Sequence, residues 1–385
     1  MKSPAEHATI QIELTSACVL RCSNCTRFCG THNVPFFLEE NEFKAAIDSV
    51  VEYAKQPHAL VGFMGGEPLL HPQFRQFCEY AITKIPREKL GLWSTFPAGG
   101  KYPEYREIIC KTFGNVLLND HSRDDILHAP VLMASEEYFR KPCAKCDGKG
   151  KTYPAGPIWR LGETITEESE TEAAKIRDVL AEPCDVCHGT GQVTDEQNLF
   201  LATEHCWIQE QWSSAINPKG AWFCEVAAAL SDLFDGPYGW KVEPGWWKRT
   251  PMEFAEQRKW ACTKCGAALP LERVRNSQDN RDDVSPGNLE RLKAIKSRKV
   301  AKGEYAVREE FVFDRELVKK GTYPHQSYKD ELYRKGIAAR YGIYLVLNER
   351  GYWEPTLTPP ATMPVQAAPP LYQIMKDRYS GEVAG

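Results

Sequence analysis

One stretch near the N-terminus, from Thr9 to Cys25, reads TIQIELTSACVLRCSNC. Its first six residues alternate apolar and polar side chains, which predicts a β-strand over Ile10–Leu14. Three cysteines, Cys18, Cys22 and Cys25, follow at C-x3-C-x2-C spacing. A strand that leads directly into a cysteine-rich loop predicts that the loop lies at the carboxyl end of that strand. Three thiolates on such a loop can ligate three irons of a [4Fe-4S] cluster and leave the fourth iron open.

A second motif, Gly65-Gly66-Glu67-Pro68, follows the apolar run Leu60–Met64. Glycines permit close backbone approach, and the Glu67 carboxylate can accept a hydrogen bond from an ammonium group. The two motifs, in this order, resemble the radical SAM superfamily. The resemblance implies a [4Fe-4S] cluster on the three cysteines and S-adenosylmethionine (SAM) on its open iron. It also implies that an electron from the cluster cleaves SAM to a 5'-deoxyadenosyl radical, and that Gly65, Gly66, Glu67 and Pro68 contact the SAM amino group.

Other candidate site residues lie at the ends of predicted strands. By the same resemblance, Ser94 and Thr95 would line the SAM ribose and carboxylate, although they could simply finish a strand. Asn24 occupies a position that is often aromatic in the superfamily, and its amide could contact adenine. Asp120 and His121 are candidates for catalysis, through substrate contact or proton handling, or for a structural role.

Cys29 adds a fourth thiol to the first cysteine loop. If it closed the cluster, no iron would remain for SAM. The C-x3-C-x2-C motif is complete without it, so we expect Cys29 to be a loop residue beside the cluster ligands.

Residues 8 to about 130 alternate strand-like and helix-like patterns. Such repetition implies an α/β fold with parallel strands and right-handed crossovers. We therefore predict a partial (β/α)6 TIM-like barrel over 1–138, with its chemistry at the carboxyl ends of the strands. The predicted strands are Ile10–Leu14, Leu60–Met64, Leu90–Thr95 and Gly114–Leu118, and the predicted helices are Glu39–Lys55, Pro72–Lys84 and Glu104–Phe113.

The strand-helix pattern stops over 139–195, where C-x2-C-x-G-x-G occurs twice. The duplicated motif resembles the cysteine-rich module of DnaJ-type chaperones. Four thiolates from two such knuckles form a tetrahedral zinc site, with an iron-sulfur cluster as the alternative. Residues 143 to 191 carry six Lys or Arg against nine Asp or Glu, which disfavours contact with nucleic acid. The metal site could serve only to stabilise this long insertion, or the insert could be a docking surface for a protein or a substrate. Its cysteines are Cys143, Cys146, Cys184 and Cys187.

A third cysteine group lies in 196–275 and surrounds a Pro-Lys-Gly turn with an aromatic strand. This arrangement resembles the SPASM or twitch region of radical SAM enzymes, which implies an auxiliary [4Fe-4S] cluster. A second zinc site is the alternative, because four thiolates suit both metals. The group consists of Cys206, Cys224, Cys262 and Cys265.

The remaining 276–385 is predicted to be a C-terminal α/β region with a Pro-rich tail. A helix is expected to begin at the Ser285-Pro286 cap and to run to about Lys299. Residues 291 to 340 hold fourteen Lys or Arg against seven Asp or Glu, interleaved with aromatic residues. This pattern suits either a phosphate-bearing substrate or a solvated helical surface.

The whole chain has 385 residues, fourteen cysteines and a formal net charge of −4, so its charge implies no general attraction to polyanions. The N-terminus lacks the apolar core of a signal peptide, and no apolar run is long enough for a membrane span. We therefore expect a soluble, cytoplasmic protein with no membrane partner. In a reducing compartment, paired C-x2-C motifs are metal ligands more often than disulfides.

The resemblance to the radical SAM superfamily implies an oxidoreductase or mutase that abstracts hydrogen from its substrate and receives electrons from a protein such as a flavodoxin or ferredoxin. We expect that substrate to be small or nucleotide-linked. If the substrate radical loses an electron, the outcome is oxidation; if it recovers hydrogen, the outcome is rearrangement. Two alternatives remain open: an enzyme that matures peptides or proteins, and a non-enzymatic metal-binding adaptor.

Overall fold

A computed structural model of the chain describes residues 1–95, 103–118, 127–133, 139–152, 181–211, 213–269, 271, 274–275, 280–308, 313–319, 342–349 and 353–359. The chain divides into two compact units. The first consists of Met1–Ser135 with Ala202–Gly385, and the second is Glu136–Leu201. The four domains predicted from the sequence stay a prediction. Within the described residues, we find no helix with the length and apolar character needed to cross a bilayer.

The first unit is built on a mixed, mostly parallel sheet of six strands in the order β11-β10-β1-β2-β3-β4. Neighbouring strands from β10 through β4 are parallel, and β11 pairs antiparallel with β10 at the edge. The chain therefore places β10 beside β1, although about 200 residues separate them. Closure into a partial (β/α)6 barrel stays a prediction. The strands are β1 (Thr9–Glu13), β2 (Leu60–Met64), β3 (Leu90–Ser94), β4 (Asn115–Leu118), β10 (Ser213–Asn217) and β11 (Gly220–Trp222).

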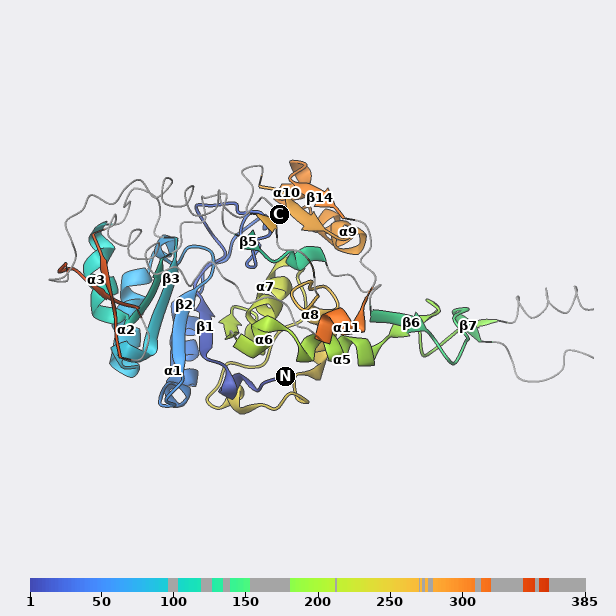
Figure 1. Cartoon of the computed structure of the whole chain (residues 1–385), viewed down its shortest axis with the longest axis horizontal. Helices are drawn as coiled ribbons and strands as arrows, with labels where there is room; N and C mark the ends of the chain where they lie inside the picture. Colours follow the sequence, from blue (N-terminus) through green and yellow to red (C-terminus); the bar gives the residue numbers. More distant parts are fainter. Residues whose placement is uncertain are drawn as a thin grey trace, which may run out of the picture. The chain divides into compact units, whose positions relative to one another are not determined.

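Three helices connect the four N-terminal strands and lie beside them in Figure 1: α1 (Glu40–Ala54), α2 (Phe74–Lys84) and α3 (Arg106–Thr112). Aromatic packing joins α1 to α2 and to the sheet. Phe43 of α1 stacks on Phe77 of α2 with ring centroids 4.0 Å apart, and meets Phe63 of β2 edge-on at 5.3 Å. All three rings are fully buried, so the predicted apolar stripe of the first helix does face the core.

All but one of the remaining α-helices and strands of the first unit follow the insert, and the exception is β5, which precedes it. The predicted helix from Ser285 to about Lys299 is wrong in its extent, because it ends at Ala294. Lys296 adopts a φ of 55°, which no α-helix accommodates, and a separate short helix follows. These remaining elements are α6 (Trp207–Gln211), α7 (Glu225–Leu233), α8 (Ala255–Cys262), β5 (Leu127–His128) paired with β12 (Val274–Arg275), β13 (Asp282–Val284) paired with β14 (Tyr305–Val307), α9 (Pro286–Ala294), α10 (Arg298–Ala301), α11 (Arg315–Lys319), and the hairpin β15 (Tyr344–Leu347) with β16 (Trp353–Thr356).

The C-terminal hairpin packs into the main core. Ile343, Leu345 and Trp353 are buried in the same cluster as the residues of β1. Arg87 also forms an ion pair with Glu354 and donates a hydrogen bond to the Pro355 carbonyl at 3.1 Å. The hairpin therefore closes the edge of the sheet, where β16 packs against β4 and α3.

The second unit contains two short antiparallel ladders. β6 (Arg140–Pro142) pairs with β9 (Gln192–Thr194), and β7 (Lys151–Thr152) pairs with β8 (Glu182–Pro183). Helix α5 (Glu196–Glu204) continues from this unit into the first. The two ladders flank the cysteines of the insert.

A buried polar network lies on β1 and joins it to two other segments. Arg27 contacts Glu225 at 2.8 Å and Glu13 at 3.3 Å, and donates to the Gln11 amide oxygen at 2.7 Å. All four side chains are buried. Burial raises the pKa of Glu13 to about 8 even though Arg27 opposes the shift.

Replacing Glu13 with Gln is expected to change the pH dependence of stability. The pKa of Glu13 is 4.5 in its ordinary state and about 8 in the folded chain. Between these values the folded protein binds one more proton than the unfolded chain, so this group makes the wild type less stable as pH rises. Gln cannot titrate, so urea unfolding should show Glu13→Gln gaining stability relative to wild type from about pH 5 to about pH 8. Glu79→Gln, on the exposed face of α2, should follow the wild-type profile. A Glu13→Gln profile parallel to the wild type would contradict the expectation.

Candidate metal centres

The first cysteine loop lies between β1 and α1. The backbone of the Gly-Gly-Glu motif forms hydrogen bonds with the residues at the start of this loop. The Gly66 N–H donates to the Thr15 carbonyl at 2.6 Å, and the Glu67 N–H donates to the Ala17 carbonyl at 2.7 Å. A Cβ on Gly66 would lie 2.0 Å from the Ala17 oxygen, a distance that sterics forbid. The glycines are therefore required by the close approach of the chain that leads into Cys18.

Glu67 is fully buried and ties the end of β2 to the end of β3. One carboxylate oxygen accepts from the Leu69 N–H and the Ser94 hydroxyl at 3.0 and 2.8 Å. The other accepts from the Thr95 N–H and hydroxyl at 2.8 and 2.7 Å. A carboxylate has about four acceptor positions, and these four bonds fill them. An ammonium group could reach Glu67 only by displacing one of these bonds, so contact with SAM stays a prediction for Glu67, Ser94 and Thr95.

Asn24 binds another part of the chain. Its backbone N–H donates to Asp282 at 2.7 Å, its side-chain amide donates to Asp283 at 2.8 Å, and its side-chain oxygen accepts from the Asp283 N–H at 2.9 Å. Asn24 has a φ of 54°, which Asn tolerates better than most residues. The predicted contact between this amide and adenine stays a prediction, since the amide is engaged by β13.

Asp282 and Lys299 clamp the first cysteine loop from the C-terminal region. The Lys299 ammonium lies 2.6 Å from the Asp282 carboxylate and donates to the Cys22 carbonyl at 2.9 Å. The second carboxylate oxygen of Asp282 accepts from the Thr31 hydroxyl at 3.2 Å. Both charged side chains are almost completely buried. No local sequence signal marks these two residues, and the sequence analysis missed them.

Two more contacts support the same loop. The His128 ring lies 2.6 Å from the Ser23 carbonyl, and Ser297 donates to the Thr31 carbonyl at 3.2 Å. His128 lies on β5, and Ser297 directly precedes α10. The loop is thus supported on several sides within the first unit.

The four thiols of the loop interact with one another, and all are partly exposed. A hydrogen bond from Cys29 lowers the pKa of Cys25, while bonds to Cys18 and Cys25 raise the pKa of Cys29. Burial and the neighbouring Cys25 and Cys18 raise the pKa of Cys22. Cys29 therefore lies among the predicted ligands.

The third cysteine group lines a cavity. Cys206, Cys224, Cys262 and Cys265 all contribute to its wall, and most of the other lining residues are apolar, among them Phe223 and Leu230. Burial and the nearby Cys206 raise the pKa of Cys224 to about 12. A bound cation would reverse this effect by stabilising thiolates. Four thiols around an apolar cavity could hold either zinc or an iron-sulfur cluster.

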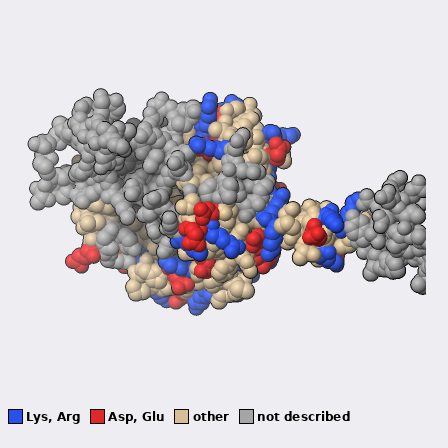
Figure 2. All heavy atoms as spheres, turned by 45° about the vertical axis from the view of Figure 1, so that its right-hand side comes forward, with Lys and Arg blue, Asp and Glu red and all other residues tan. Residues whose placement is uncertain are grey.

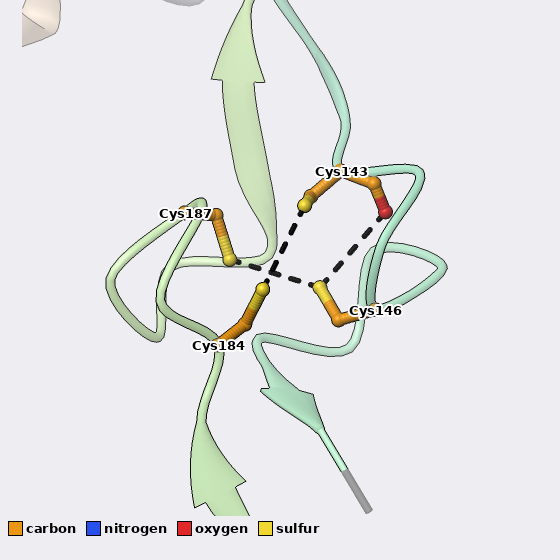
Figure 3. A group of neighbouring side chains, drawn as sticks. All are labelled: Cys143, Cys146, Cys184 and Cys187. Atoms are coloured by element: carbon orange, nitrogen blue, oxygen red, sulfur yellow. Dashed lines mark hydrogen bonds between the residues drawn. The ribbon is translucent and has the colours of Figure 1, made fainter.

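The cysteines of the insert form a tight group, shown in Figure 3. All four sulfurs lie within 4.8 Å of one another, with Cys143 3.9 Å from Cys184 and Cys146 3.7 Å from Cys187. Four sulfurs about 2.3 Å from one tetrahedral zinc ion would be separated by about 3.8 Å. These sulfur positions therefore suit a single ion.

Backbone amides support this group symmetrically. The Gly150 N–H donates to the Cys146 sulfur at 3.2 Å, and the Gly191 N–H donates to the Cys187 sulfur at 3.3 Å. Both glycines have φ near 75°, as the turn requires. The repeated C-x2-C-x-G-x-G motif thus builds two equivalent halves of one site.

Replacing Cys143 with Ser is expected to lower the zinc content by about one ion per chain, because a structural tetrathiolate site needs all four ligands. Limited proteolysis should then cut the second unit faster, because metal binding and folding of such a module are linked. Cys110→Ser, at a half-buried position on α3, serves as the control. Unchanged zinc content in Cys143→Ser would refute the site.

Replacing Lys299 with Ala should destabilise the first unit by about 3–5 kcal/mol, because Asp282 would remain buried without its partner. The exposed Lys293, paired with Glu290 at 2.7 Å, offers a matched Lys→Ala control that should change stability by less than about 1 kcal/mol. Equal unfolding midpoints for the two variants would contradict the role of the buried pair.

Asp120 and His121, the predicted catalytic residues, lie outside the described residues. No family model matches the chain, and no curated protein matches it. Among solved structures, the crystal structure of BtrN in complex with AdoMet and 2-DOIA is similar to this chain with a TM-score of 0.34 and 12% sequence identity, over 67% of this chain and 88% of that chain.

Proposed function

We propose that this chain is a radical SAM enzyme. The observation that carries the proposal is the placement of Cys18, Cys22 and Cys25 on a loop after β1, held at its beginning by Gly66 and Glu67 after β2. Both motifs thus meet at the carboxyl ends of adjacent parallel strands, where α/β proteins place their ligands.

The donor set fits an iron-sulfur cluster better than a single metal ion. Within the part of the chain that the structure describes, only the cysteines of the insert gather within 4.8 Å of one another. Cys18, Cys22 and Cys25 are more widely spread. Thiolates that bind separate irons of a cube are farther apart than thiolates that share one ion. When bound, the cluster would supply the electron that cleaves SAM and releases the 5'-deoxyadenosyl radical.

The chain's own residues would hold this loop in one geometry. Lys299 fixes the Cys22 carbonyl and Asn24 fixes the loop to β13, so the ligands need little reordering when the cluster binds. Glu67 and its four donors brace the ends of β2 and β3 below the site. These residues would act by positioning the loop that carries the cluster ligands.

We assign an auxiliary [4Fe-4S] cluster to Cys206, Cys224, Cys262 and Cys265, and zinc to the insert. The spacing of the sulfur atoms supports these two assignments. The cysteines of the third group line a cavity, whereas the four sulfurs of the insert lie within 4.8 Å of one another, which suits one ion. The auxiliary cluster, fully ligated by cysteine, would accept an electron from the substrate radical, which favours net oxidation over rearrangement. The external reductant would be a protein such as a flavodoxin or ferredoxin.

The proposed substrate is small or nucleotide-linked. Exposed Lys293, Lys296, Arg298 and Lys302 on and around α9 and α10 support this choice, because this segment also clamps the first cysteine loop. Figure 2 shows basic and acidic side chains interspersed over the described part of the visible face.

Anaerobic reconstitution tests the proposal directly. The protein with SAM and dithionite should produce 5'-deoxyadenosine, and Cys22→Ala should abolish it because one iron loses its ligand. Cys110→Ala should retain activity. Metal analysis should give about eight irons and about one zinc per chain. Absence of 5'-deoxyadenosine from well-loaded protein would refute the enzyme, and about four irons with about two zincs would refute the auxiliary cluster.

A further inference from the structure

The turn over 262–265, which carries two cysteines of the third group, is held by a residue far along the chain. The Asn288 side-chain amide donates to the Lys264 carbonyl at 3.0 Å and to the Leu132 carbonyl at 2.9 Å. Asn288 is fully buried, and its amide nitrogen has two hydrogens, so these two carbonyls use both of them. If the turn moved, a buried donor would lose its acceptor, which costs free energy.

Asn288 belongs to a segment that also holds the first cysteine loop. It lies on α9, between β13 and α10. Asp283 of β13 accepts from the Asn24 side-chain amide at 2.8 Å, and Lys299 of α10 donates to the Cys22 carbonyl at 2.9 Å. The segment from β13 to α10 therefore contacts both cysteine groups of the first unit.

A second contact joins the same two groups on the side of the sheet. Arg27, two residues after Cys25, forms an ion pair with Glu225 at 2.8 Å. Glu225 is the first residue of α7 and directly follows Cys224. Both charged side chains are buried, so neither can leave its partner without a cost in desolvation. The first cysteine loop is thus tied to the third cysteine group in two separate places.

We propose that the auxiliary cluster on the third cysteine group fixes the first cysteine loop, so that the two sites load cooperatively. This inference rests on the proposed function. A cluster bound to all four cysteines of the third group holds the 262–265 turn and the start of α7 together, because metal binding orders its ligands. Asn288 and Glu225 then keep their partners, and through them the first cysteine loop is restrained. The coupling is reciprocal, as linkage requires.

The consequence is an order of assembly. The first cysteine loop binds its cluster more weakly until the third group is loaded. A substrate radical is therefore formed mainly in chains that already contain its electron acceptor.

The test compares anaerobically reconstituted wild type, Cys265→Ala and Cys143→Ala by iron content and by hydrogen exchange of residues 18–32. Cys265→Ala should lose more than the roughly four irons of its own cluster. Its first cysteine loop should exchange about tenfold faster than in wild type, because one end of the coupling is lost. Exchange of β2 should stay at the wild-type rate, which shows that the variant is folded.

Cys143→Ala is the matched control, because it removes a metal ligand from the second unit instead. It should leave the iron content and the exchange of the first cysteine loop as in wild type. The proposal is overturned if Cys265→Ala keeps about four irons and the wild-type exchange of that loop.

Two further variants test the contacts themselves. Asn288→Ala and Glu225→Ala each cut one tie and leave every cysteine in place. In either background, Cys265→Ala should have a smaller effect on the first cysteine loop than it has alone, as a double-mutant cycle measures. Lys293→Ala, at an exposed position on α9, should leave that effect at full size. The two ties are separate, so one variant can be read if the other does not fold.

An undiminished effect in both backgrounds would show that these contacts carry no coupling, and it would overturn the proposal. Failure of the proposed function gives a different result. If wild type cleaves SAM while Cys265→Ala leaves the first cysteine loop unchanged, only the coupling is refuted. If well-loaded wild type produces no 5'-deoxyadenosine, the enzyme proposal fails, and iron content with hydrogen exchange still decides whether the two sites are coupled.

Discussion

The buried ion pair between Asp282 and Lys299 is the interaction on which the candidate active site depends. It joins β13 to α10, and its two members reach the Cys22 carbonyl, the Asn24 N–H and the Thr31 hydroxyl. A buried pair of this kind gains little net stability over an apolar pair, because desolvation offsets the attraction. The ion pair instead fixes the local geometry, because burying either charge costs free energy unless all of its hydrogen-bond and ion-pair partners are in place. The cysteine loop, which has no regular secondary structure of its own, obtains its shape from this requirement.

The same chemical group, a set of thiols, is arranged in three ways. In the insert, two glycine-rich turns bring four sulfurs to the spacing of one tetrahedral ion. Around α7 and α8, four cysteines line an apolar cavity. On the first loop, four partly exposed thiols interact at the carboxyl end of the sheet. Under the proposed assignments, spacing and exposure, rather than ligand type, would distinguish the structural ion from the buried cluster and from the site that a cofactor can reach.

The sequence predicted the elements whose signals are local. The strand Leu60–Met64 was predicted with its observed bounds, and helix α1 within one residue at each end, because apolar periodicity and capping lie within these segments. The grouping of the insert cysteines also followed from a repeated motif. The position of β10 beside β1 could not be predicted, since strand order depends on long-range packing. Lys299 could not be recognised either, because a lysine within a basic stretch has no local feature that marks it as buried.

The Gly-Gly-Glu motif shows why a family motif can report on the fold as well as on a ligand. Gly66 must lack a side chain because the Ala17 carbonyl occupies the space, and Glu67 must be a carboxylate because four donors converge on it. Both requirements exist before any cofactor binds. The motif therefore sets the direction in which the chain enters Cys18. Contact with SAM would add a second constraint on residues that the fold already restricts.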